Sequence, residues 1–202
     1  MVFGTVTHEP TTGAVIPSVT FGVPLRNNMI ALNSGFSENL FPRTSGIVAG
    51  SALSGARFST VQSSGAGTPP PEWPVLSFGT TAVEGRLWNG TVPRLYASTM
   101  TLSGMFYAAT ATSGSATFNA SIACWSDGDA ACTAKTFGTV ATTSVDVPGT
   151  AGVVKAFSIT MTDTNGAAAV DSFCVHLSRG TAAGQAGGDI VLKRLDMFFN
   201  LI

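Results

Sequence analysis

Residues 118–124 read FNASIAC, and every second residue from Phe118 to Cys124 is apolar. The stretches FSITM at 157–161 and FCVHLSR at 173–179 alternate in the same way. Successive side chains of a β-strand point to opposite faces, so this period predicts strands with one buried face. The aromatic residues and threonines in and around these stretches also favour strands. We therefore expect each stretch to pack one face on a core.

Two further stretches extend the pattern. Thr99–Ser103 alternates, and Gly104–Tyr107 continues it as the buried end of a strand. In the last segment the apolar residues change parity between 190–192 and 195–199. A β-bulge at Lys193–Arg194 would return both sets to one buried face.

Turn-forming pairs separate these stretches, and no segment between them has helical periodicity. The pairs are Asn89-Gly90, Ser113-Gly114, Asp127-Gly128, Pro148-Gly149 and Asn165-Gly166. About eight short strands over roughly 130 residues, without a helix, predict a sandwich or a barrel. Their size and spacing favour a jelly roll. The expected fold class is all-β, with a jelly-roll-like antiparallel β-sandwich over residues 69–202.

Residues 1–68 have a different character. Gly, Ser, Thr and Pro interrupt their apolar residues every few positions, and the run Pro69-Pro70-Pro71 follows. Such a segment favours extended backbone, so we expect an extended N-terminal arm that serves as an attachment region. Its apolar clusters cannot form a core alone and are the candidate partner contacts. They are Val15, Ile16, Phe21, Leu40, Phe41, Ile47 and Val48.

The charge content is low. Only 10% of the 202 residues are charged and the formal net charge is −1, against about 25% charged residues in an average domain. This excludes a nucleic-acid-binding protein that works by neutralising phosphates, and also a highly charged disordered chain. No apolar run approaches the ~20 residues of a membrane span, and Met1–Gly13 lacks the pattern of a signal peptide. We expect no nucleic-acid or membrane partner, and synthesis in a reducing cytoplasm.

Residues that could carry catalysis are few and poorly placed. His8 lies in the expected arm, and His176 alternates with core positions, so it should face outward from a strand. Neither a G-x-S-x-G elbow nor a phosphate-binding glycine loop occurs. The acidic residues form no recognisable glycosidase pair. They are Glu72, Glu84, Asp127, Asp129, Asp163 and Asp171. We therefore expect no catalytic site, no cofactor and no enzymatic activity.

Metal binding is not indicated either. Cys124, Cys132 and Cys174 lack the paired spacing of a zinc site. They are expected to be reduced and structural, with a Cys124–Cys132 disulfide as the alternative. Asp127–Asp129 and Asp163–Gly166 resemble parts of a calcium loop but lack its full spacing. We interpret both as turns without a metal.

Three tryptophans offer a possible binding feature. Trp73, Trp88 and Trp125 could form a platform on which sugar rings stack. Trp125 ends an expected strand and Trp88 precedes an expected turn, which would expose at least one of them. The alternative is that they are large apolar residues at sheet margins or in an interface.

Four segments occur in a recognisable order: Pro74–Phe78, Val92–Tyr96, Phe173–Arg179 and Gly188–Phe199. They resemble the first core strand, the proline-containing start of the next strand and the closing hairpin of a jelly-roll domain that recurs in virion proteins of tailed bacteriophages. The resemblance covers roughly residues 73–200. It implies a capsid decoration (cement) protein, a head fibre or a tail fibre, commonly a homotrimer, and it implies no catalytic residues.

The main functional expectation is a structural virion protein. A homotrimeric capsid decoration protein would use its arm to bind the major capsid protein at the outer capsid surface of a bacteriophage. The low charge suits large, dry contacts of this kind. The alternative is a head- or tail-fibre receptor-binding protein whose exposed aromatic residues bind a host glycan. An enzyme on a β-sandwich, a glycosidase or a lyase, is the third and least supported reading.

Overall fold

The computed structural model describes residues 36–39, 47–48, 54–55, 57–62, 72–80, 84–129, 134–181 and 183–202. The chain divides into two units, Met1–Ser34 and Gly35–Ile202, and the described residues all belong to the second. Every regular element in this described part is a β-strand. Within the same residues, no helix is long and apolar enough to span a membrane.

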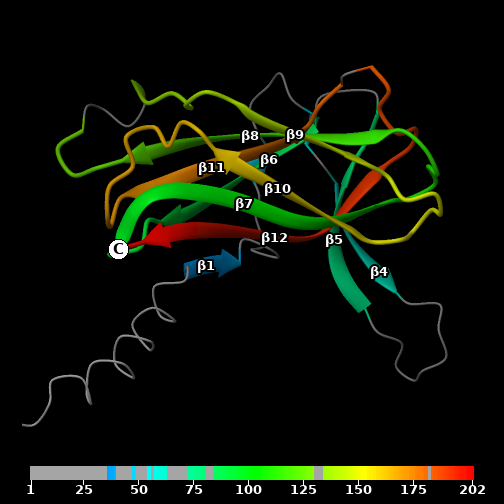
Figure 1. The fold of residues 1–202 in the computed structure, drawn as a ribbon, viewed down its shortest axis with the longest axis horizontal. Helices are drawn as coiled ribbons and strands as arrows, with labels where there is room; N and C mark the ends of the chain where they lie inside the picture. The colour runs from blue at the N-terminus through cyan, green and yellow to red at the C-terminus, as the bar shows by residue number, and fades with distance from the viewer. Residues whose placement is uncertain are drawn as a thin grey trace, which may run out of the picture. The chain divides into compact units, whose positions relative to one another are not determined.

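The strands form two sheets that pack face to face (Figure 1). Sheet A has the order β10-β7-β12-β5-β4, with β1 also paired to β12. Sheet B has the order β2-β6-β11-β8-β9, with β3 paired in parallel to β6. The strands are β1 (Phe36–Asn39), β2 (Ile47–Val48), β3 (Ser54–Gly55), β4 (Arg57–Gln62), β5 (Glu72–Phe78), β6 (Glu84–Thr91), β7 (Tyr96–Ala108), β8 (Ser115–Trp125), β9 (Ala141–Asp146), β10 (Lys155–Met161), β11 (Ser172–Arg179) and β12 (Ile190–Leu201).

The eight strands from β5 through β12 pair with one another in the pattern of a jelly roll. The first strand of this set pairs with the last, β5 with β12, and then β6 with β11, β7 with β10 and β8 with β9. Successive pairs alternate between sheets A and B, as they do when one long hairpin is rolled into two layers. The all-β, jelly-roll-like sandwich expected from the sequence is therefore confirmed.

Two expectations about the connections are wrong. The segments resembling a closing hairpin are β11 and β12, which lie in different sheets, so the loop between them crosses the sandwich. Asn89-Gly90, expected as a turn, lies inside β6 and pairs with Cys174 and Phe173 of β11. Alternation reveals which residues are buried but carries no information about which sheet a strand joins.

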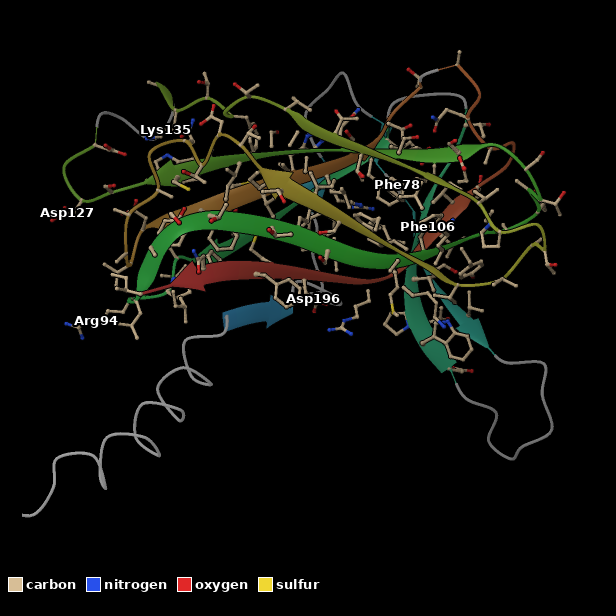
Figure 2. The ribbon with its side chains drawn as sticks, in the orientation of Figure 1. Phe78, Arg94, Phe106, Asp127, Lys135 and Asp196 are labelled. Atoms are coloured by element: carbon tan, nitrogen blue, oxygen red, sulfur yellow. The ribbon has the colours of Figure 1, made fainter. Side chains whose placement is uncertain are left out.

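Aromatic rings fill the middle of the core between the sheets. The Phe118 ring, from sheet B, stacks on the Phe157 ring, from sheet A, with centroids 4.1 Å apart. Phe106 packs edge-on against Phe118 at 5.2 Å. Figure 2 places Phe78 and Phe106 in this interior. The burial of apolar surface from both sheets is the main force that holds the two layers together.

The sandwich begins earlier than the expected boundary at residue 68. β4 pairs with β5 over six registers, and β1 pairs with β12 over four. Among the candidate contact residues, Ile47 and Val48 form β2, whose backbone pairs with Leu87 and Arg86 of β6. The others, Val15, Ile16, Phe21, Leu40 and Phe41, lie outside the described residues, as does most of the expected arm.

Candidate functional site

The outer face of sheet A is open over β10, β7 and β12. A groove of about 500 Å³ lies there, within the ~300–1,000 Å³ common for ligand sites. Three cross-strand rows run along this face of the sheet: Ala156–Met105–Arg194, Ser158–Ser103–Asp196 and Thr160–Thr101–Phe198. We call the groove the sheet A groove and define it by Ser103, Met105, Ser158, Arg194, Asp196 and Phe198, which all line it.

A β-bulge in β12 sets which side chains enter the groove. Leu192 pairs with Phe106 and Arg194 with Met105, so Lys193 is the extra residue. The bulge changes the parity of the strand, as the sequence predicted. Ile190 and Leu192 before it and Leu195, Met197 and Phe199 after it are all buried in the core. Arg194, Asp196 and Phe198 consequently share the outer face.

Gly104 lets the backbone of the β12 bulge and the Phe157 ring of the core approach each other beneath the groove. A Cβ atom at Gly104 would lie 2.7 Å from the carbonyl oxygen of Arg194 and 2.4 Å from Cε1 of Phe157. Both distances are shorter than van der Waals contact, so only glycine fits without a shift of backbone or ring. The groove floor is therefore built by Gly104 and Phe157 together.

The sheet A groove contains one charged pair. Arg194 Nε forms an ion pair with Oδ2 of Asp196 on the same face of β12. The Asp196 side chain is only 6% exposed, whereas that of Arg194 is 54% exposed. A buried carboxylate is costly unless a cation pairs with it, so Asp196 holds the guanidinium in a defined orientation. Figure 2 labels Asp196 on β12, close to the paired strand β1.

Apolar and hydroxyl groups make up the rest of the groove. Met105 and Phe198 are exposed large hydrophobic residues, at 41% and 37%. The Ser103 hydroxyl donates to the Ser158 hydroxyl at 3.2 Å across β7 and β10. Met105 was expected in the buried end of a strand and instead faces outward, because the inward positions of β7 are those of Leu102, Gly104 and Phe106. The groove thus combines an apolar surface with hydrogen-bonding groups.

The corresponding face of sheet B is closed. Ser121, Ala123 and Cys174 lie on outward positions of β8 and β11, yet all three are buried. The segment before β9 lies close to this face: Gly138 N donates to the Ile122 carbonyl at 2.9 Å, and the Phe137 ring contacts His176 at 5.9 Å. A ligand approaching this face from solvent would meet these covering groups first.

His176 faces outward from β11 as expected but is half-buried rather than exposed. Its Nε2 atom is buried, with no hydrogen-bond partner among the described residues. Burial lowers the pKa of the His176 imidazole below its ordinary value. No cluster of three or more potential metal ligands occurs in the described part of the chain. The other histidine, His8, lies outside the described residues.

Cys124 and Cys174 are free and buried, and Cys132 lies outside the described residues. Burial, with a smaller contribution from Asp171, raises the pKa of the Cys124 thiol to about 12. Burial also raises the pKa of Cys174 to about 11. Both therefore remain thiols at neutral pH and are poor nucleophiles.

The carboxylates of the two acidic turns accept hydrogen bonds from neighbouring groups of the protein. The Asp163 carboxylate accepts from Thr139 N at 2.7 Å and Asn165 N at 2.8 Å, and these bonds lower its pKa. Asp129 accepts from Ser126 N and Lys135 Nζ, both at 3.0 Å. These hydrogen bonds give both turns a structural role.

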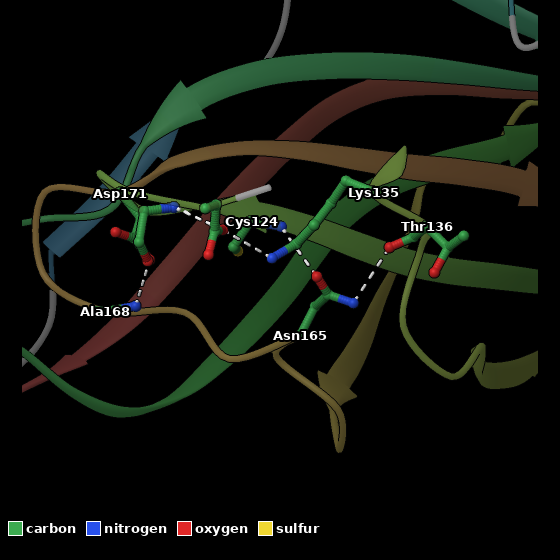
Figure 3. A network of polar contacts seen from close by, with 8 residues as sticks. Cys124, Lys135, Thr136, Asn165, Ala168 and Asp171 are labelled. Atoms are coloured by element: carbon green, nitrogen blue, oxygen red, sulfur yellow. Dashed lines mark hydrogen bonds and ion pairs between the residues drawn. The ribbon is translucent and has the colours of Figure 1, made fainter. Parts of the chain in front are cut away.

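Asp171 and Asn165 fasten the neighbouring loops to the end of β8 (Figure 3). Asp171 Oδ2 accepts from Ala168 N at 2.7 Å and from the Ser126 hydroxyl at 2.8 Å. Asn165 donates to the Thr136 carbonyl and accepts from Cys124 N. Asp171 and Asn165 therefore organise the loops at this end of the sandwich.

The three tryptophans do not form a platform. Trp88 is buried in the core between the sheets. Trp73 lies in β5 of sheet A, with Lys193 Nζ 4.2 Å from its ring centre, and Trp125 ends β8 of sheet B. The indole nitrogens of Trp73 and Trp125 are buried. The alternative reading, large apolar residues at sheet margins and in the core, describes them better.

Sequence reasoning singled out none of the six defining residues of the sheet A groove as site residues. One signal was present: Met105 and Phe198 are large apolar residues at positions where the alternation of their strands places side chains in solvent. An outward apolar residue on each of two neighbouring strands is a stronger sign of a binding surface than a single one.

Comparison with known proteins gives likeness in structure only. No protein-family model and no curated protein matches the sequence. A family 11 carbohydrate-binding module from Clostridium thermocellum, in complex with a mixed-linked tetrasaccharide, is 14% identical with a TM-score of 0.41 over 83% of this chain and 97% of the module.

Two larger proteins are similar over a part of their length. The enzymatically active domain of tailspike protein 4 of bacteriophage CBA120 is 12% identical, with a TM-score of 0.42 over 81% of this chain and 20% of the tailspike. An arabinose-bound α-L-arabinofuranosidase is 15% identical, with a TM-score of 0.41 over 72% of this chain and 22% of the enzyme. This chain is similar to all three in its β-sandwich, and such low scores indicate nothing about its ligand.

Proposed function

We propose that this chain is a non-catalytic, saccharide-binding jelly-roll domain of a bacteriophage fibre, and that the sheet A groove is its binding site. The groove itself carries the proposal. It is an open hollow of about 500 Å³ over β7, β10 and β12, bordered by Val145 of β9, and its apolar and polar groups lie side by side.

A saccharide matches this mixture of groups. A sugar ring presents apolar C–H faces beside a rim of hydroxyl groups, and aromatic side chains bind such faces by stacking. Phe198 and Met105 supply the apolar contacts. Ser103, Ser158 and Arg194 supply donors and acceptors, and Asp196 pairs with Arg194. The low charge of the chain also fits a ligand bound by stacking and hydrogen bonding rather than by charge alone.

Assignment to a fibre rests on the resemblance of residues 73–200 to virion jelly-roll domains. In this proposal the protein is a homotrimer, and each copy presents one groove. Several grooves on one particle give avidity, so a weak contact per groove is sufficient for attachment to a cell surface.

A glycan-array screen followed by titration calorimetry tests the function. We expect the wild-type protein to bind at least one oligosaccharide, and Phe198→Ala to weaken that binding by more than tenfold. Phe137→Ala is the matched control, because Phe137 is exposed to a similar degree, 41%, but contacts His176 of sheet B. Equal losses for the two variants, or no binding by the wild type, would reject the proposal.

Capsid decoration is the second candidate, favoured by exposed apolar side chains in three chain segments. Leu95, Val170 and Ile202 are all exposed, and Ile202 N donates to the Leu95 carbonyl at 2.9 Å. Such side chains suit a dry contact with a shell. If decoration is the function, Leu95→Asp with Val170→Asp will abolish cosedimentation with virion shells. Under the fibre proposal the same double variant will bind saccharide normally.

A further inference from the structure

We propose that the ligand of the sheet A groove is an acidic saccharide whose carboxylate binds the outer edge of the Arg194 guanidinium. This inference rests on the proposed function, because it names the ligand class of the same groove. Its observation is the way in which Asp196 holds Arg194.

The Arg194–Asp196 contact leaves most of the guanidinium available. Asp196 Oδ2 binds Nε, the nitrogen nearest the chain. In the described part of the structure, no hydrogen bond joins the two terminal nitrogens of Arg194 to another residue. More than half of the Arg194 side chain is exposed to solvent, and the residue lines the groove. The planar fork of these nitrogens matches the two oxygens of a carboxylate.

Asp196 acts as a positioning residue in this arrangement. Its side chain is only 6% exposed and its carboxylate pairs with Nε, so it fixes the guanidinium while presenting little surface to a ligand in the groove. An arginine held at Nε loses less conformational freedom on binding than a free surface arginine. The site is therefore preorganised for a group that approaches from the solvent side.

The charge of the groove is suited to one anionic group. Arg194 and Asp196 are its charged lining residues, and the remaining ones are hydroxyl-bearing, small or apolar. The neighbouring cation, Lys193, is the extra residue of the bulge and lies over the Trp73 ring. An anionic ligand thus meets a single cationic fork, beside Met105 from the adjacent strand. We infer that each groove binds one carboxylated sugar residue.

The test compares acidic probes with neutral counterparts. The probes are sialyllactose against lactose, and galacturonic acid oligomers against their methyl esters. We expect each acidic member to bind at least tenfold more tightly than its neutral partner, and Arg194→Gln to remove this difference. Arg194→Lys should retain a part of it, because the charge remains while the fork is lost.

A second variant distinguishes a loss of ligand selectivity from a loss of folding. Arg194→Gln leaves Asp196 without its cation, whereas Arg194→Gln combined with Asp196→Asn removes both charges and keeps similar shapes. We expect the double variant to melt within a few degrees of the wild type and to lose selectivity for the acidic member. If the neutral members bound as tightly as the acidic ones, the proposal of an acidic ligand would be rejected, whereas the proposal that the groove binds saccharide would stand. Phe198→Ala, which should weaken both members, reports on the groove alone.

Discussion

The outer faces of sheets A and B are both formed by alternate residues of their strands, but one face is exposed to solvent and the other is covered. On sheet A, Met105, Arg194 and Phe198 are exposed and line a groove. On sheet B, Ser121 and Cys174 hold equivalent outward positions and are buried. The difference teaches that the period of a strand decides which residues leave the core, whereas the connecting segments decide whether those residues reach solvent.

The first way to sharpen this comparison is to separate the core from the groove. Phe118 is fully buried and stacked on Phe157, so Phe118→Ala should lower the free energy of unfolding by ~3–5 kcal/mol. Phe198 lies on the outer face, and Phe198→Ala should cost less than ~1 kcal/mol. Urea unfolding of both variants measures this. Similar losses would mean that Phe198 belongs to the core.

Gly104 offers a second test, at the junction of core and groove. Gly104→Ala places a methyl group against the Phe157 ring and the Arg194 carbonyl. Such overpacking typically costs ~1–3 kcal/mol, and we expect a loss in that range. The variant should also weaken saccharide binding, since the bulge that orients Arg194 must shift. Wild-type unfolding and binding by Gly104→Ala would contradict the described floor of the groove.

His176 provides a smaller, pH-dependent test of the closed face. Because burial lowers its folded-state pKa, the unfolded chain binds a proton below about pH 6.5 that the folded chain does not. The contribution of His176 to stability is thus present above that pH and is lost as the pH falls toward the folded pKa. The slope stays under ~1.4 kcal/mol per pH unit, the limit for one proton, and is reduced because the ring is only half-buried.

His176→Gln should flatten this acid limb of the stability curve. Urea unfolding between pH 7.5 and 5 checks it, with Asp163 as the internal reference. Hydrogen bonds from Thr139 N and Asn165 N lower the Asp163 pKa. Its contribution is therefore lost only at still lower pH, through the carboxyl range. An unchanged curve in His176→Gln would mean that the sheet B face is open to water.

Much of the fold was predictable because its signal is local. Alternation identified β8, β10 and β11, and the parity change located the bulge between Leu192 and Arg194. The assignment of β11 and β12 to different sheets was not predictable, because strand pairing depends on contacts distant in sequence. Asn89-Gly90 reads as a turn by local preference, yet the ladder with β11 keeps it extended.

The candidate site was less predictable than the fold. The groove depends on the juxtaposition of β7 with β10, about fifty positions away in the chain, and with β12, about ninety positions away. A sequence shows Arg194 and Asp196 as neighbours but not that one is exposed and the other buried. That asymmetry comes from packing. Trp73, Trp88 and Trp125 are candidates by residue type, but Trp73 lies in sheet A, and of the two in sheet B Trp88 is buried in the core.

The central claim is that saccharide binds the open face of sheet A and not the closed face of sheet B. Amide chemical-shift mapping by NMR, with sialyllactose or galacturonic acid oligomers as the titrant, tests it most directly. We predict saturable shifts that cluster at Ser103–Met105, Ala156–Ser158 and Arg194–Phe198, with little change at Ser121–Ala123 and Cys174–His176. Shifts centred on the sheet B residues, or scattered without saturation, would contradict the claim.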